Sequence, residues 1–135
     1  YNYDTPDPKG YAAFPFSEVL ERARERVPAA RFVSGDFMEL AFEDGSYDVV
    51  VALEVLSHVA DQRAFVQKIA GHLKSGGYLM LATQNRYVLE RFNRIPPPDP
   101  GQLRHWVDRR ELLRLLQQGF EVLELFSVSP KANRA

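Results

Sequence analysis

The chain has 135 residues, the length of one ordinary domain. Its 17 Lys and Arg residues almost balance its 18 Asp and Glu residues, so no strong electrostatic field favours binding to nucleic acid or to an anionic membrane. The chain has no cysteine, which excludes disulfides, thiolate metal ligands and cysteine nucleophiles within it. No apolar run reaches the roughly 18 residues of a membrane span and the start does not resemble a signal peptide, so we expect a cytoplasmic protein.

The first 40 residues predict one helix between irregular segments. Residues 1–16 are expected to be irregular, because their prolines and aromatic residues follow neither a helical nor a strand period. A helix is predicted from Ser17, a favourable N-cap, to the residue before Pro28. A short strand is predicted at 31–34, and Gly35 opens the loop that follows.

The middle of the chain predicts a strand, a helix and a second strand. Residues 49–53 are all apolar, which is typical of a strand buried on both faces of a parallel sheet. Asp61 is the expected N-cap of a helix that ends at Lys74, before two glycines. A second apolar run at 78–82 predicts the next buried strand.

The last third predicts a loop, a helix and a final strand. Four prolines within 95–101 exclude a helix or a central strand there. Asp108 and Glu111 have the spacing of a capping box, and the leucine-rich helix after them ends at Gly119. Residues 120–128 predict the final strand. This alternation of helices and strands indicates an α/β fold with a mostly parallel sheet.

Two stretches of the sequence resemble class I S-adenosylmethionine-dependent methyltransferases of the small-molecule type. One runs from Gly35 to Val59 and includes Gly35-Asp36-Phe37; the other is Lys74–Leu81, similar to the L-K-P-G-G-x-L entry to the family's fifth strand. The resemblance implies a Rossmann-like fold, S-adenosylmethionine as cofactor, and methyl transfer to an oxygen or nitrogen atom of a small molecule. We expect a partial methyltransferase domain over 17–128 and a tail over 129–135.

The resemblance also implies which residues bind the cofactor. Asp36 would accept a hydrogen bond from the adenine amino group, and the backbone N–H of Phe37 would meet the adenine ring. Alternatively, Asp36 caps the turn that follows it. Leu53 and Glu54 end the first apolar strand, where open parallel sheets bind ligands, and are expected beside the methionine part of the cofactor. An acid at a strand end is also often simply solvated.

Two histidines are candidates for the general base. His58 follows the first apolar strand and His105 lies in a lid-like segment, and an imidazole suits proton transfer near neutral pH. The alternative for His58 is a hydrogen-bonding role in a turn. Gln84 and Asn85, after the second strand, and Trp106 are predicted to contact substrate, although Trp106 could equally anchor its loop. No metal is expected.

Parts of the family pattern are missing. No D-x-G-x-G turn follows a first strand, and Phe14 stands where the family has an acid for the ribose. We therefore expect strands 1, 2 and 7 of the family to be absent, and residues to be omitted near Phe16–Ser17. These departures keep two alternatives open: a methyltransferase-like domain that binds a partner instead of the cofactor, and a nicotinamide-dependent oxidoreductase.

Overall fold

The computed structural model describes residues 16–93, 95–96 and 98–128. The tail predicted for 129–135, and all of the predicted irregular segment except Phe16, lie outside these residues. The chain divides into two compact units, of which the first ends at Leu40 and the second begins at Ala41. Among the described residues, no helix combines the length and the apolar character needed to cross a membrane.

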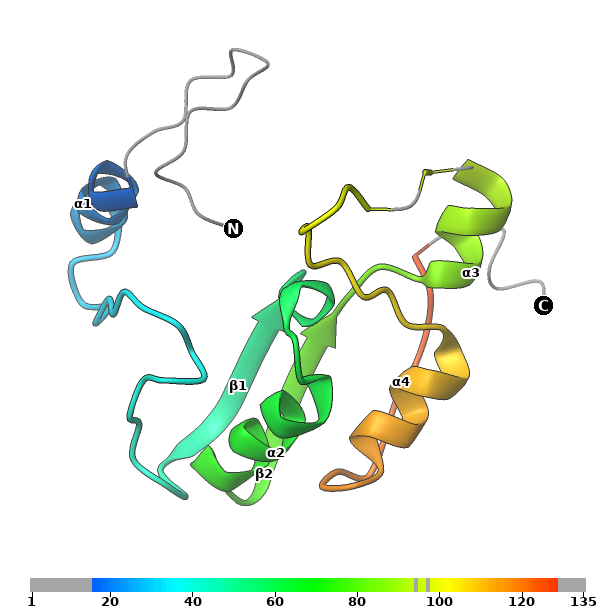
Figure 1. Cartoon of the computed structure of the whole chain (residues 1–135). Helices are drawn as coiled ribbons and strands as arrows, with labels where there is room; N and C mark the ends of the chain where they lie inside the picture. Colours follow the sequence, from blue (N-terminus) through cyan, green and yellow to red (C-terminus); the bar gives the residue numbers. More distant parts are fainter. Residues whose placement is uncertain (1–15, 94, 97, 129–135) are drawn as a thin grey trace. The chain divides into compact units, whose positions relative to one another are not determined.

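The first unit contains helix α1, Phe16–Arg26 (Figure 1). Glu18 in its first turn pairs with Arg22 four residues later at 2.7 Å, a spacing that favours an exposed helix. The helix ends before Pro28, as predicted. It includes the junction of Phe16 and Ser17, near which we expect residues to be omitted, and that omission stays a prediction.

The strand predicted at 31–34 was wrong. These residues are irregular, and the described part of the first unit contains no strand with which they could pair. Because a strand satisfies its backbone groups only through a neighbour, a tetrapeptide without one has no reason to stay extended. Phe32 instead lines a small hollow together with Val19 and Ala23 of α1.

The second unit is built on a parallel pair of strands, β1 (Tyr47–Leu53) and β2 (Leu73–Ala82). Both predicted apolar strands are therefore confirmed, and each begins earlier than its apolar run. The register alternates between two faces of the sheet: Val50 and Ala52 pair with Leu79 and Leu81 on one face, and Val49 and Val51 pair with Tyr78 and Met80 on the other.

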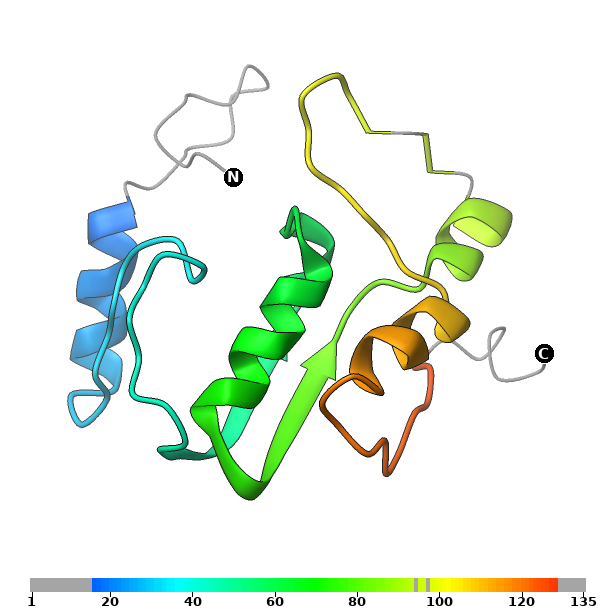
Figure 2. The same cartoon turned by 60° about the horizontal axis from the view of Figure 1, so that its bottom comes forward.

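Helix α2 (Gln62–His72) covers one face of this sheet (Figures 1 and 2). Its N-cap is Asp61, as predicted, whose carboxylate accepts from the backbone N–H of Ala64 at 2.9 Å. The core lies between helix and sheet and extends to the segment before the last helix; its buried apolar residues are Ala52, Leu56, Phe65, Val66, Ile69, Leu73 and Val107.

The end of α2 differs from the prediction. The helix stops at His72, and Lys74 and the two glycines belong to β2. A Cβ placed on Gly77 would lie 3.0 Å from the carbonyl oxygens of both Asp48 and Lys74. Gly77 thus permits a close approach of the two strands that no other residue would allow.

Three further elements follow the sheet. The sequence did not predict the short helix α3 (Arg86–Val88) or the π-helical turn η2 (Leu89–Asn93). Helix α4 (Arg109–Leu116) begins with the predicted capping box and lies beside α2 (Figure 2). The described residues of 95–101 form no helix or strand, as expected.

The final strand predicted at 120–128 was wrong, since this segment is irregular and pairs with no strand of the described structure. Phe120, Val122 and Leu125 are half-buried, whereas Leu123, Phe126 and Val128 are 68–92% exposed. The parallel sheet flanked by helices confirms the α/β class in a partial form. The described sheet has two strands, fewer than the complete family fold.

Candidate functional site

The carboxyl ends of β1 and β2 lie at the same edge of the sheet, the edge at which open parallel sheets bind ligands. Glu54 follows β1, and its backbone N–H donates to the carbonyl of Ala82 at 2.8 Å. Its φ of +58° lies in the left-handed region, which costs a non-glycine residue on the order of 1 kcal/mol. This strained residue turns the chain out of β1, and nothing in the sequence pattern signalled its conformation.

The chain then forms a single 3-10 turn, η1 (Leu56–His58), which carries one of the two candidate bases. The ring of His58 is exposed, and its Nδ1 lies 3.3 Å from the carbonyl oxygen of Leu103. His58 therefore contacts the segment before α4, as well as belonging to a turn. The alternative prediction for His58 was a hydrogen-bonding role in a turn, and the contact with Leu103 has this character.

The second candidate base is brought to the same edge. The backbone N–H of His105 donates to the carbonyl of Ser57 at 2.7 Å. The side-chain amide of Gln62 donates to the carbonyls of both Leu56 (3.0 Å) and His105 (2.8 Å). These bonds hold the predicted lid segment against η1, so residues more than 40 positions apart share one site. Sequence reasoning missed Gln62, which carries no motif.

Three buried oxygens at this edge lack a hydrogen-bond partner in the described structure. They are Oγ of Ser57, Oγ1 of Thr83 and Oε1 of Gln84. Leaving such a group buried and unpaired costs about 1–3 kcal/mol. Unsatisfied buried polar groups at the carboxyl edge of a sheet are sites where a polar ligand would restore the lost bonds.

The two other predicted substrate residues have structural roles as well. The side chain of Asn85 accepts from the backbone N–H of Tyr87 at 3.1 Å and caps α3. Trp106 is half-buried, with the guanidinium of Arg104 4.5 Å from its ring centroid. Trp106 and His105 both line an open hollow of about 560 Å³.

A charged group fixes the start of α4 next to this hollow. Arg86 pairs with Asp108 at 2.9 Å and with Glu111 at 3.0 Å. Hydrogen bonds from the backbone N–H groups of Glu111 and Arg110, together with the positive charge of Arg86, hold the pKa of Asp108 below its usual value of 3.8 despite desolvation. The sequence predicted the capping box but not Arg86.

The residues predicted to bind adenine lie in the first unit. One carboxylate oxygen of Asp36, Oδ1, accepts from the backbone N–H of Met38 at 2.8 Å, so the turn-capping alternative is present. The N–H of Met38 bonds to Oδ1 and not to Oδ2, and the side chain of Asp36 is exposed to solvent. A Cβ on Gly35 would lie 3.1 Å from the side chain of Leu40, which favours glycine before this turn. Phe37 is half-buried.

Leu53, predicted beside the methionine part of the cofactor, is 62% exposed on the face of the sheet that α2 does not cover. Within the described ranges, no group of three or more acidic, histidine or cysteine side chains could hold a metal ion.

Comparison with known proteins gives consistent matches. Residues 5–125 match the family model described as a methyltransferase domain. A probable S-adenosylmethionine-dependent methyltransferase of Mycolicibacterium smegmatis is 35% identical over 111 residues, which cover 82% of this chain and 42% of that protein. Another, from Mycobacterium tuberculosis, is 36% identical over 98 residues, covering 73% of this chain and 35% of that protein.

A third relative is an O-methyltransferase of Aspergillus sclerotiorum, 35% identical over 101 residues, which cover 67% of this chain and 36% of that protein. The chain thus spans well under half of the length of these relatives. No solved structure matches the chain significantly.

Proposed function

The chain belongs to the methyltransferase-domain family, and we propose that the protein it forms transfers a methyl group from S-adenosylmethionine to an oxygen or nitrogen atom of a small molecule. The observation that carries this proposal is the family match over residues 5–125. The relatives named as S-adenosylmethionine-dependent enzymes support the cofactor, and the relative named an O-methyltransferase supports a small acceptor. None of these names supports the oxidoreductase alternative.

The residues at the carboxyl edge fit the cofactor in part. The cofactor's ammonium and hydroxyl groups are hydrogen-bond donors, and the buried oxygens of Ser57, Thr83 and Gln84 are acceptors without partners. Glu54 adds a carboxylate at the same edge. We assign Asp36 and Phe37 to the adenine, and Leu53 and Glu54 to the methionine part.

S-adenosylmethionine supplies the electrophilic methyl group on its sulfonium. The chain's own residues position the acceptor, exclude water and hold a proton. For a hydroxyl acceptor, the imidazole of His105 or His58 accepts the proton as the new bond forms, and we place His105 first because it lies in the segment that covers the edge. Gln84, Asn85 and Trp106 are assigned to substrate contacts.

Calorimetric titration with S-adenosylmethionine tests the cofactor assignment. Asp36→Ala should weaken binding by about 1–3 kcal/mol, the loss of one charge-assisted hydrogen bond. Asp36→Asn keeps an acceptor for the Met38 N–H, so a loss that persists in this variant comes from ligand contact rather than from the turn. Glu39→Ala, an exposed carboxylate in the same unit, is the matched control. Absence of binding to the complete protein would favour the partner-binding alternative.

The base is tested by turnover of the two histidine variants. His105→Ala should lower kcat by about 10²–10⁴-fold, the usual contribution of general-base catalysis, while affinity for S-adenosylmethionine stays unchanged. His58→Ala is compared in the same assay. If both variants stay within about threefold of the parent, neither imidazole is the base and catalysis depends on positioning.

A further inference from the structure

The hollow that contains His105 and Trp106 has an unusual concentration of positive charge. It lies between α2 and α4, has a volume of about 560 Å³, and includes Arg63 of α2 and Arg114 of α4. Arg104 lies in the segment between α3 and α4 and lines the same hollow. We call Arg63, Arg104 and Arg114, with Trp106 and Leu115 as apolar walls, the arginine hollow.

The charges of these three arginines are not compensated. Arg86 and Glu111 also line the hollow, and Arg86 is neutralised by Asp108 at 2.9 Å and by Glu111 at 3.0 Å. In the part of the chain that the structure describes, neither Arg63, Arg104 nor Arg114 has a carboxylate within 4.0 Å. Three guanidinium groups that share one concave surface repel each other, and an anion relieves that repulsion.

Arg104 has a buried hydrogen-bond donor without a partner in the described structure. Its Nη2 donates to the carbonyl of Pro96 at 2.6 Å, and its plane lies over the Trp106 ring. Its Nε is buried and has no hydrogen-bond partner in the described structure. Arginine is the side chain best suited to bind carboxylate or phosphate through parallel N–H bonds, and this one is held in place on both sides.

We propose that the arginine hollow binds the oxyanion of the methyl acceptor, so that the acceptor is an organic acid with a carboxylate or phosphate group on an apolar body. The volume is within the range of small-ligand sites, about 300–1,000 Å³. Trp106 and Leu115 contact the apolar body, while His105, in the same hollow, faces the acceptor group. This inference rests on the proposed methyl transfer for the identity of the ligand as the acceptor.

Direct binding measurements test the hollow without the cofactor. The probes are 2-naphthoate, 2-naphthyl phosphate and the neutral 2-naphthamide, titrated by calorimetry into the complete protein. We expect the acids to bind and the amide to bind at least tenfold more weakly; whichever acid binds more tightly identifies carboxylate or phosphate as the preferred group. Equal affinity of the amide would overturn the proposal.

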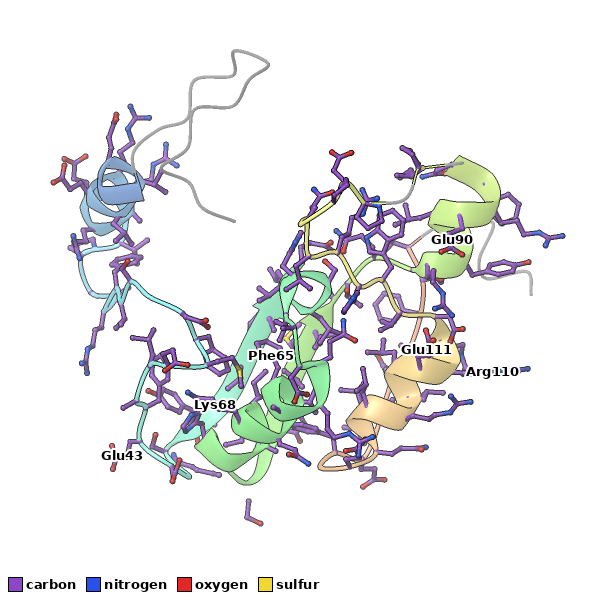
Figure 3. All side chains as sticks on the ribbon, viewed as in Figure 1. Glu43, Phe65, Lys68, Glu90, Arg110 and Glu111 are labelled. Carbon is purple, nitrogen blue, oxygen red and sulfur yellow. The ribbon has the colours of Figure 1, made fainter. Side chains whose placement is uncertain are left out.

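Single substitutions locate the bound anion. Arg63→Ala and Arg114→Ala remove exposed side chains, so the fold should persist, and each should weaken naphthoate binding at least tenfold. Arg114→Lys keeps the charge and should recover part of the loss. The matched control is Arg110→Ala on the same helix: Arg110 does not line the hollow, and its side chain points away from α2 (Figure 3). An equal loss in Arg110→Ala would contradict the proposal.

Turnover separates this inference from the proposed function. If the protein binds the acid through Arg63 and Arg114 and methylates it, with kcat/KM reduced at least tenfold in both variants, the assignment is supported. If it methylates other acceptors with no effect of these variants, methyl transfer stands and the arginine hollow is wrong as the acceptor site. Binding of the acid with no methyl transfer to any acceptor would overturn the proposed function and leave an organic-acid site.

Discussion

The two faces of the β1–β2 sheet carry the same kind of side chain but have different surroundings. Val50, Ala52 and Leu79 lie on the face that α2 covers, where Ala52 is 6% exposed. The opposite face, which we call the bare face, is 49–62% exposed at its apolar residues Val49, Val51, Leu53, Tyr78 and Met80. An apolar run predicts burial on both faces, and in the second unit only one of them is buried.

This difference shows what an apolar run can and cannot predict. An apolar run predicts that both faces of the strand are covered by apolar groups. It does not predict which segment covers each face. A contiguous apolar patch on a protein surface commonly marks a contact site. Substitutions on the two faces measure whether the bare face is in contact with anything in solution.

A charge introduced on each face should have the largest effect. Ala52→Asp places an unpaired carboxylate in the core and should destabilise the fold by about 3–5 kcal/mol or prevent folding. Val51→Asp, the neighbouring residue on the bare face, should cost about 1 kcal/mol, the loss of β propensity. Urea unfolding measures both. If Val51→Asp lowered the free energy of unfolding as much as Ala52→Asp, the bare face would be covered in solution.

Truncating two leucines three residues apart gives the next largest contrast. Leu56, the first residue of η1, is 1% exposed, so Leu56→Ala leaves a cavity and should cost about 2–5 kcal/mol. Leu53→Ala, on the bare face, should cost less than about 1 kcal/mol. Thermal unfolding of the matched pair measures the difference. Equal costs would mean that Leu53 contacts a partner surface, whether a cofactor, another segment or a second copy.

Helices α2 and α4 differ in what stabilises them, and we expect a smaller loss of stability from a substitution at the start of α4. Helix α2 has four buried residues, whereas α4 has none. The start of α4 therefore depends on its capping box, in which Asp108 accepts from the backbone N–H groups of Arg110 and Glu111. Asp108→Ala should cost about 1 kcal/mol. Hydrogen exchange should show faster opening of α4 than of α2; unchanged protection in α4 would argue that packing alone holds it.

The pH dependence at Asp108 should be the smallest effect. Because its pKa is lowered in the folded state, mainly by the hydrogen bond from the Glu111 N–H, the stability it contributes is present above its usual value of 3.8 and is lost as pH falls through the lower folded value. Asp108→Asn can still cap but does not titrate. The stability difference between parent and variant should shrink from about pH 6 to about pH 3; a constant difference would exclude this ionisation.

The sequence predicted three of the four α-helices of the described residues, α1, α2 and α4, whereas two of its four predicted strands are absent there. Asp61 and the pair Asp108 and Glu111 mark helix starts by chemistry confined to one turn. Apolar runs identified β1 and β2 equally well. The same reasoning predicted strands at 31–34 and 120–128, which are irregular in the structure.

The reason is that a helix makes its backbone hydrogen bonds within itself, while a strand makes them with a neighbour that may be far away in the chain. The sequence of 31–34 fits a strand, but the described part of its unit has no partner for it. The same dependence on distant segments explains why the short α3 and the left-handed Glu54 escaped prediction.

The sequence by itself determined the α/β class, the starts of α2 and α4, the two strands β1 and β2 and the resemblance that led to the family. It also identified His58, His105 and Trp106 as candidates, because these residue types follow the strand ends and the proline loop. The tertiary structure decided which of them share a site. Gln62, the unpaired oxygens and the arginine hollow come from segments joined only by folding, since their contacts depend on how helices and strands pack and not on their order in the chain.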